Sequence, residues 1–272
     1  MKRSLAFLLC MVGCSESRSE PPLPSTLVDL ASARLVDLSH GYDENTLYWP
    51  TSPTSFEMEE LAYGPTDAGY FYSAYSFCTP EHGGTHLDAP IHFSENGRTT
   101  GEIPVRQLIA PGVILDISEA AATDPDALLD LATIEDWESR NGPVPEGAIV
   151  LLRSGWASYW GDAMRYLGDD TPGDASQLHF PGYGADAARY LVEERRVGAL
   201  GVDSASIDHG PSTGFPVHRI AGGAGVASLE NVASLDGLPE RGFWVIALPV
   251  KIAKGSGGPV RIVAVLPEGG AS

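Results

Sequence analysis

Short apolar runs, each bounded by glycine, proline or aspartate, recur along most of the chain and predict β-strands. The clearest runs cover residues 35–38, 71–78, 113–117, 149–153, 199–203, 243–249 and 260–266. Helices are predicted over residues 133–140, where Thr133 and Asp136 form a capping pair, and over residues 185–196, after a turn rich in proline and glycine. Such a mixture predicts an α/β fold with a mixed β-sheet flanked by helices.

No change in composition, repeat or low-complexity tract interrupts the chain beyond residue 35. Hydrophobic residues make up 43% of the sequence, which is enough to bury a core. We therefore expect residues 35–272 to form a single domain. Within it, residues 70–78 alternate rings with small side chains, which predicts a half-buried strand over 71–78.

The N-terminal residues follow a different pattern. Positive residues are followed by a short apolar run that ends at Cys14, and this run is too short to cross a bilayer, which takes roughly 20 residues. We expect residues 1–13 to be a signal peptide, Cys14 to be lipidated because Met11-Val12-Gly13-Cys14 resembles the bacterial lipobox, and residues 14–34 to form a flexible tether. This predicts an exported protein that is lipid-anchored on the extracytoplasmic side of a bacterial membrane. Plain secretion and a buried N-terminal strand are the alternatives.

The charge of the chain excludes one class of partner. There are 17 Lys and Arg against 36 Asp and Glu, a formal net charge of −19, and the basic residues form no cluster. Such a surface repels phosphate backbones, so we expect no nucleic-acid partner. Two of the three cysteines lie in the first 14 residues, which excludes a disulfide scaffold, and Cys78 lies in an apolar run that predicts a buried thiol.

Three of the seven histidines fall within residues 82–92. Glycine and proline in this stretch exclude a continuous helix, and even spacings would place His82, His86, Asp88 and His92 on one side of an extended segment. Neutral imidazole and carboxylate are ligands that suit zinc, manganese or iron, and the absence of thiolates argues against a structural zinc site. A metal site is the favoured interpretation of this segment, and a structural histidine cluster is the alternative.

The same stretch, His-x-Gly-Thr-His-x-Asp-x-Pro-x-His, resembles the signature of the metal-dependent cyclase family, which includes bacterial kynurenine formamidase and isatin hydrolase. Further blocks resemble this family at residues 36–40, 201–208, 215–218, 229–231, 248–252 and 255–261. The resemblance covers roughly residues 35–267. It implies a cyclase fold of the swivelling β/β/α kind and, in most members, a homodimer with a site near the subunit contact.

Site residues follow from the resemblance position by position. It implies that His82, His86 and Asp88 are metal ligands, that His218 and Glu230 complete the shell or bind a second ion, and that the cofactor is zinc or manganese, as one or two ions. Without the resemblance, a surface histidine and a helix-end glutamate would be the preferred interpretation of the last two.

The resemblance also assigns His92 to catalysis, and the chemistry supports this role, since the leaving amine needs a proton donor beside a metal-activated water. The expected activity is therefore hydrolysis of a C–N amide bond in an aryl formamide such as N-formylkynurenine, with His92 as general acid and base. A cyclic aryl amide such as isatin is the alternative substrate. A lipoprotein that binds metal at the cell surface without catalysis is the alternative from another class.

Several residues have open roles at this stage. His40, His179 and His209 could line the site or be structural, and Asp203, Ser204 and Ser206 could support it from a strand end. Aromatic walls for an aryl substrate are expected from the following rings: Tyr48, Trp49, Phe71, Tyr72 and Trp156.

Overall fold

The computed structural model describes residues 29–268. The predicted signal peptide, the proposed lipidation site Cys14 and most of the predicted tether lie outside these residues. Within them, no helix has both the length and the apolar character that crossing a bilayer requires.

A mixed β-sheet forms the centre of the molecule and closes into a barrel of seven strands, because β12 pairs with β11 along most of its length and with β4 at its start. In order around the barrel these strands are β12 (Gly257–Leu266), β11 (Phe243–Pro249), β5 (Ile109–Asp116), β7 (Ile149–Arg153), β9 (Ala199–Val202), β10 (Ala227–Glu230) and β4 (His86–Asp88). The strand β1 (Arg34–Asp37) extends the sheet beside the far end of β12. The predicted α/β fold with a mixed sheet is confirmed. The closure of that sheet into a barrel was not predicted, because apolar runs do not reveal which edges pair.

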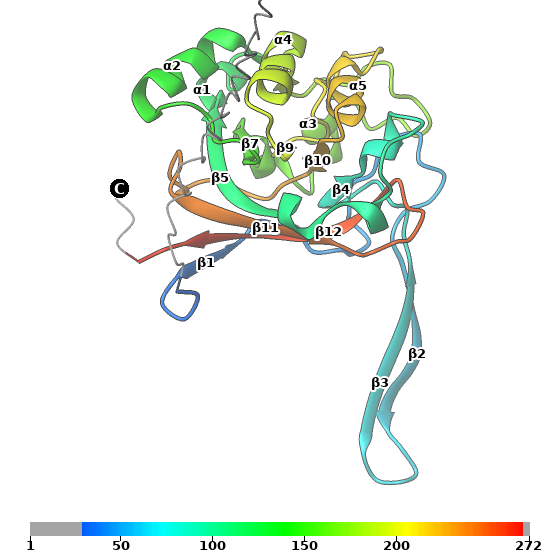
Figure 1. Cartoon of the computed structure of the whole chain (residues 1–272). Helices are drawn as coiled ribbons and strands as arrows, with labels where there is room; N and C mark the ends of the chain where they lie inside the picture. Colours follow the sequence, from blue (N-terminus) through cyan, green and yellow to red (C-terminus); the bar gives the residue numbers. More distant parts are fainter. Residues whose placement is uncertain (1–28, 269–272) are drawn as a thin grey trace, which may run out of the picture.

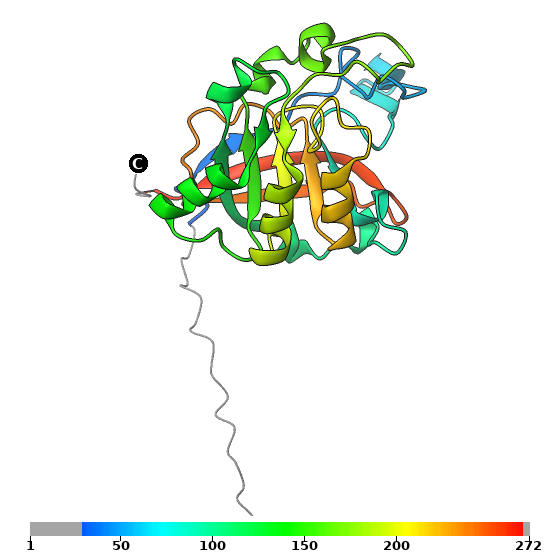
Figure 2. The ribbon, with the colours of Figure 1, turned by 90° about the horizontal axis from the view of Figure 1, so that it is seen from above.

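Helices cover one side of the barrel, over its parallel strands β5, β7, β9 and β10 (Figures 1 and 2). The helical segments of the described chain are α1 (Ser118–Ala121), α2 (Leu131–Asn141), α3 (Ala163–Leu167), α4 (Ala185–Arg189), α5 (Pro216–Gly223), the short 3-10 turns η1 (Pro90–His92), η2 (Thr100–Glu102), η3 (Val105–Gln107) and η4 (Trp156–Tyr159), and the π-helical turn η5 (Tyr190–Glu194). A small parallel pair, β6 (Leu128–Leu129) and β8 (Gly182–Tyr183), joins this layer. The predicted helix over 185–196 is thus α4 followed by η5.

Alternating side chains divide the interior into two cores. In β5, Ile114 faces the core inside the barrel, whereas Val113 and Leu115 face the core beneath the helices, and β7 alternates in the same way. The predicted capping pair of α2 is wrong, since the helix starts two residues earlier, at Leu131. Asp130 is its N-cap, and its carboxylate accepts a hydrogen bond from the Thr133 amide at 2.8 Å.

Two strands stand away from the barrel. β2 (Glu57–Pro65) and β3 (Phe71–Cys78) form an antiparallel hairpin that projects from the body of the molecule, and we call it the arm (Figure 1). The predicted half-buried strand at 71–78 is a strand, but most of its residues are exposed, and the thiol of Cys78, expected to be buried, is exposed as well. The alternation was read correctly, but the arm extends away from the barrel, and Phe77 near its base stacks on Phe56 with ring centroids 6.0 Å apart.

Candidate metal centre and cavity

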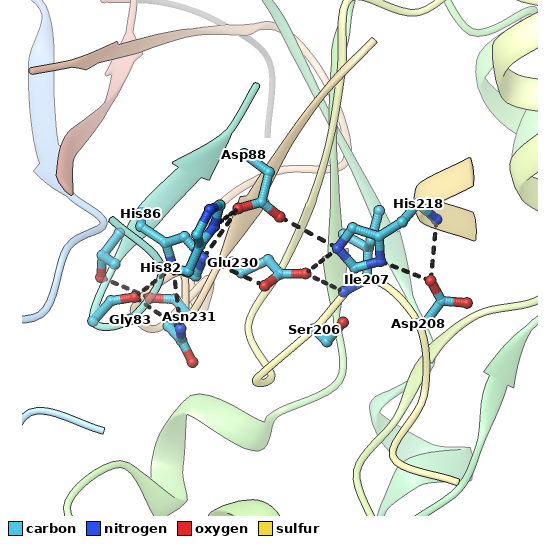
Figure 3. A network of polar contacts seen from close by, with 12 residues as sticks. His82, Gly83, His86, Asp88, Ser206, Ile207, Asp208, His218, Glu230 and Asn231 are labelled. Carbon is cyan, nitrogen blue, oxygen red and sulfur yellow. Dashed lines mark hydrogen bonds and ion pairs between the residues drawn. The ribbon is translucent and has the colours of Figure 1, made fainter. Parts of the chain in front are cut away.

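Five side chains that the sequence predicts as metal ligands come together from distant parts of the chain (Figure 3). His86 and Asp88 lie two residues apart on β4 and therefore point to the same side of that strand. His82 reaches the centre from the preceding loop, His218 from α5, and Glu230 from the last residue of β10, which pairs directly with His86. All except His82 are buried.

Asp88 lies in the middle of this cluster. Its Oδ1 is 2.6 Å from His82 Nδ1 and 3.2 Å from His86 Nε2, whereas its Oδ2 is 3.3 Å from His218 Nε2. One carboxylate therefore joins two donor groups, His82 with His86 on one side and His218 with Glu230 on the other. Within each group of three, the possible ligand atoms lie within 4.8 Å of one another.

Glu230 also lies between two of these histidines, His86 and His218. Its Oε2 is 3.5 Å from His86 Nε2 and its Oε1 is 3.1 Å from His218 Nε2, and Oε1 also accepts a hydrogen bond from the Ile207 amide at 2.9 Å. Buried carboxylates and imidazoles converge here with no lysine or arginine among them. This donor set fits a divalent transition metal, as one ion or two.

Hydrogen bonds on the outer nitrogens orient two of the histidines. His86 Nδ1 donates to the carbonyl of Gly84 at 3.0 Å, and His218 Nδ1 donates to Asp208 Oδ2 at 2.7 Å. In both residues this leaves the Nε2 lone pair directed at the centre. Asp208 is itself held by the amides of Val217 and His218. The sequence analysis placed Asp208 in a family-like block without a role, and only the folded chain brings it to His218.

The charges in the cluster shift the pKa values of its members in opposite directions. Burial alone would lower the pKa of His86, but the carboxylates of Asp88 and Glu230 outweigh it and raise it to about 9. Burial alone would raise the pKa of Asp88, yet His86, His218 and His82 hold it well below its usual range. The carboxylates of this cluster thus favour positive charge at the buried imidazoles, and a bound cation would satisfy the same preference.

His92 lies beside the cluster and not within it. Its ring stacks on His82 with centroids 3.9 Å apart and is 6.0 Å from the ring of His218. Surrounding protein lowers the pKa of His92, which favours the neutral imidazole. Among the described residues, no hydrogen bond engages its ring nitrogens. His92 is thus placed beside the donor atoms with both nitrogens free to exchange a proton.

The segment from His82 to His92 is not the single extended stretch that the spacing predicts. Only His86–Asp88 is a strand, whereas Gly83 and Gly84 form a turn with positive φ values of 147° and 58°, and His92 ends the 3-10 turn η1. At Gly84 a Cβ atom would lie 2.5 Å from the ring of Tyr42, so this turn requires glycine.

An aromatic cavity of about 420 Å³ opens onto the cluster. The phenyl ring of Phe93 lies 4.5 Å from the ring of His218, and that of Phe215 lies 5.4 Å from Phe93 and 6.3 Å from Trp49, measured between centroids. The residues that line it are Leu47, Tyr48, Trp49, Thr51, Ser52, Pro53, Pro80, His82, Gly83, His86, His92, Phe93, Leu167, Ala205, Ser206, Phe215, His218, Glu230 and Asn231.

The predicted aromatic walls are correct in part. Tyr48 and Trp49 line the cavity, but Phe71 and Tyr72 lie on the arm, and Trp156 is buried in the core, where its indole donates to the carbonyl of Tyr166. Phe93 and Phe215, which the sequence analysis did not single out, supply the remaining rings. Each is close in sequence to a histidine of the site, which is a signal that could have found them.

The residues with open roles separate clearly. Ser206 lines the cavity, whereas His40 stacks on Trp160 and His179 pairs with Asp126 near the surface. His209 does not line the cavity, and its carbonyl accepts a turn hydrogen bond from the Ser212 amide. Two further residues from the same strand end are buried and bonded elsewhere: Asp203 to Ser154, and Ser204 to the carbonyl of Pro181.

Comparison with known proteins agrees with this geometry. Residues 36–209 match the family described as putative cyclase. The chain belongs to that family. Isatin hydrolase from Roseibium aggregatum is 35% identical over 196 residues, which is 69% of this chain and 73% of that protein. Kynurenine formamidase from Salinibacter ruber is 26% identical over 232 residues, 84% of this chain and 96% of that protein.

Solved structures of this family share the fold. A crystal structure of an isatin hydrolase bound to the product analogue thioisatinate has a TM-score of 0.80 and 30% sequence identity, covering 88% of this chain and 94% of that one. An isatin hydrolase A from Labrenzia aggregata, bound to benzyl benzoate, has a TM-score of 0.79 and 33% identity, covering 88% and 95%. Family membership, together with the buried histidine and carboxylate cluster, makes this chain a cyclase-family metal-dependent hydrolase.

Proposed function

We propose that this protein hydrolyses the C–N bond of a small, uncharged cyclic aryl amide of the isatin kind. The observation that carries this proposal is the combination of the Asp88-centred cluster with an apolar aromatic cavity directly above it. The sequence analysis favoured N-formylkynurenine and held isatin as the alternative. The 35% identity to an isatin hydrolase supports the alternative.

Five residues would hold the ion or ions: His82, His86, Asp88, His218 and Glu230. A divalent metal held there would supply a Lewis acid for the amide carbonyl and would lower the pKa of a water molecule. His92 accepts the proton that the attacking water loses and delivers it to the departing nitrogen, which leaves as an amine, while the carbonyl carbon becomes a carboxylate. Phe93, Phe215 and Trp49 hold the aryl ring and keep bulk water away from it.

The charge of the cavity walls bears on the choice of substrate. N-formylkynurenine carries an amino acid group with one positive and one negative charge, whereas isatin is a flat, neutral ring. None of the residues that line the cavity is lysine or arginine, so an α-carboxylate has no guanidinium or ammonium group to pair with there. Transfer of an unpaired charge into an apolar cavity is costly, which favours the neutral substrate.

The test is kcat/KM of the purified, metal-analysed protein on isatin and on N-formylkynurenine. We expect isatin to be preferred by about tenfold or more, which corresponds to about 1.4 kcal/mol of transition-state preference. The opposite ratio would establish a formamidase. Metal binding without turnover of either compound would favour the non-catalytic metal-binding protein, although a capture protein has no use for His92 beside the cluster.

We further propose that the protein is a homodimer in which the arm contacts the second copy. The register of the arm places its large apolar side chains on one face, with small or acidic residues on most of the other. The apolar face consists of Met58, Tyr63, Phe71, Tyr75 and Phe77, which are between 40% and 68% exposed. A two-stranded hairpin is marginal by itself, and an exposed apolar face of this kind is typical of a protein interface.

Light scattering coupled to size-exclusion chromatography tests this assembly. The wild type is expected to elute as a dimer, and the Phe71→Glu, Phe77→Glu double variant as a folded monomer. Tyr72→Glu is the matched control, because Tyr72 is 52% exposed on the opposite face of the same strand. A wild-type monomer, or a dimer that survives the double substitution, would contradict the proposal.

We also propose that the mature protein begins at a lipidated Cys14 and is anchored on the extracytoplasmic side of a bacterial membrane. Its support is the sequence before and around Cys14 alone. In membrane fractions, wild type should sediment with the membrane, whereas Cys14→Ser should be soluble in the same compartment. Wild-type protein found in the cytosol with Met1 intact would contradict it.

A further inference from the structure

His82 differs from the other two histidines of the metal cluster in how it faces the centre. His86 and His218 present Nε2 to the carboxylates, whereas His82 presents Nδ1, which lies 2.6 Å from Asp88 Oδ1. Its side chain is also the most accessible of the three, at 27% against 4% and 6%. Because His82 comes from a loop that ends in two glycines, its backbone does not fix the ring as a strand fixes His86.

The outer nitrogen of His82 has a partner from the opposite end of the chain. His82 Nε2 is 2.8 Å from Ser256 Oγ, and Ser256 Oγ is in turn 2.7 Å from Glu81 Oε2. A carboxylate oxygen can only accept, so the Ser256 hydroxyl donates to Glu81 and accepts from His82. The direction of these bonds places the proton of a neutral His82 ring on Nε2 and leaves the Nδ1 lone pair for the centre.

The rest of the chain holds Ser256 firmly. Its amide donates to Glu81 Oε2 at 2.9 Å, and its carbonyl accepts from the Ala89 amide at 2.8 Å, one residue after Asp88. The next residue, Gly257, begins β12 opposite Asp88, and a Cβ atom at Gly257 would lie 2.6 Å from the His82 ring. The pairing of β12 with β4, which closes the barrel, therefore places Ser256 and Gly257 directly against the His82 ring.

We propose that Ser256 and Glu81 are positioning residues for His82, which hold its ring in the Nε2-protonated form so that Nδ1 can bind the metal. This inference rests on the proposed role of His82 as a ligand. It adds two residues from outside the cluster on which the most exposed ligand depends. Because His92 stacks on His82, the two residues also hold the face against which His92 lies.

The experiment measures zinc and manganese affinity of the full chain by competition with a chelator. Loss of a residue that orients a ligand typically weakens metal binding by about 10- to 100-fold, so we expect that loss for Ser256→Ala and for Glu81→Ala. Ser256→Thr retains the hydroxyl and should restore affinity to within a few-fold. Ser154→Ala is the matched control, because it removes another serine hydroxyl bonded to a carboxylate, Asp203, that does not touch His82.

A second readout reports the ring of His82 in the wild type directly. Nitrogen-15 NMR of the histidines in the zinc-loaded wild type should show one ring with its proton on Nε2 and metal on Nδ1, assigned to His82 by its loss in His82→Ala. Wild-type affinity retained in Ser256→Ala, or His82 protonated on Nδ1, would overturn the inference while the proposed function stands. Wild-type protein that binds neither metal would overturn both.

Discussion

The imidazole rings of His82 and His92 stack with centroids 3.9 Å apart and planes inclined by 19°. His82 Nδ1 lies 2.6 Å from Asp88 Oδ1, whereas the ring nitrogens of His92 make no hydrogen bond among the described residues. Two neighbouring histidines in one motif are thus separated into a ligand-like ring and a ring free to move protons. The first prediction tests this division of roles.

His92→Ala should keep the metal and the fold but lower kcat by about 10²- to 10⁴-fold, the usual effect of losing a general acid or base. Metal content, measured by elemental analysis, should equal that of wild type. His179→Ala is the control, because His179 pairs with Asp126 away from the cavity and its loss should leave kcat unchanged. A His92→Ala protein without metal would make His92 a ligand instead.

His86→Ala and Asp88→Ala should each abolish metal occupancy. Asp88 contacts histidines of both donor groups, and His86 contacts both carboxylates, so either loss leaves an incomplete shell. The same elemental analysis on protein dialysed against a weak chelator checks this. Full metal occupancy in both variants would show that the metal site lies elsewhere.

Phe215→Ala should weaken substrate binding more than it slows the chemical step. The Phe215 ring forms part of the cavity wall, and its centroid lies 6.0 Å from that of His218, so kcat/KM for an aryl amide should fall about tenfold or more, mainly through KM. Leu128→Ala truncates an exposed apolar side chain outside the cavity and serves as the control. A selective loss of kcat with KM unchanged would count against a binding role for this ring.

His40 should make stability depend on pH in the acidic range. Burial lowers its pKa from 6.5 to about 4, and its buried Nε2 has no hydrogen-bond partner. The unfolded chain therefore binds a proton that the folded chain does not, so the stabilising contribution is full above about pH 6.5 and is lost as the pH falls towards 4. Allowing for partial exposure, this amounts to about 1 to 2 kcal/mol.

The measurement is urea unfolding with a chelator present, at about pH 7 and about pH 4.5, for wild type and His40→Phe. Phenylalanine preserves the stacking on Trp160 but cannot be protonated. The variant should lose less stability than wild type between the two pH values. Equal losses in the two proteins would show that His40 is not a source of the acid sensitivity.

Local patterns predicted the elements of this fold better than their arrangement. The strands at 149–153 and 243–249 have the predicted bounds, because hydrophobic runs and turn residues act within a few positions. The closure of the barrel depends on Gly257 meeting Asp88, about 170 residues away, and no periodicity encodes that contact. In the arm, the alternating pattern correctly predicted a strand but not its burial, since most of its apolar side chains are exposed.

The candidate site divides in the same way. The spacing of His82, His86 and Asp88 predicted one donor group from the residues alone, because these residues are neighbours in the chain. His218 and Glu230 entered only through the resemblance to a family, since nothing local distinguishes them from an ordinary histidine and glutamate. Ser256 and Glu81 became visible only when β12 was placed beside β4.

The closing strand β12 also determines when during folding the centre can exist. The donor residues of the metal centre lie between residues 82 and 230, and the Ser256 loop, which orients the His82 ring, lies in the last fifth of the chain. An incomplete or unfolded chain therefore presents only scattered ligands. Metal capture is then coupled to the completion of folding and not to synthesis. The compartment in which the barrel closes, with the metals available there, therefore selects the ion that this protein carries.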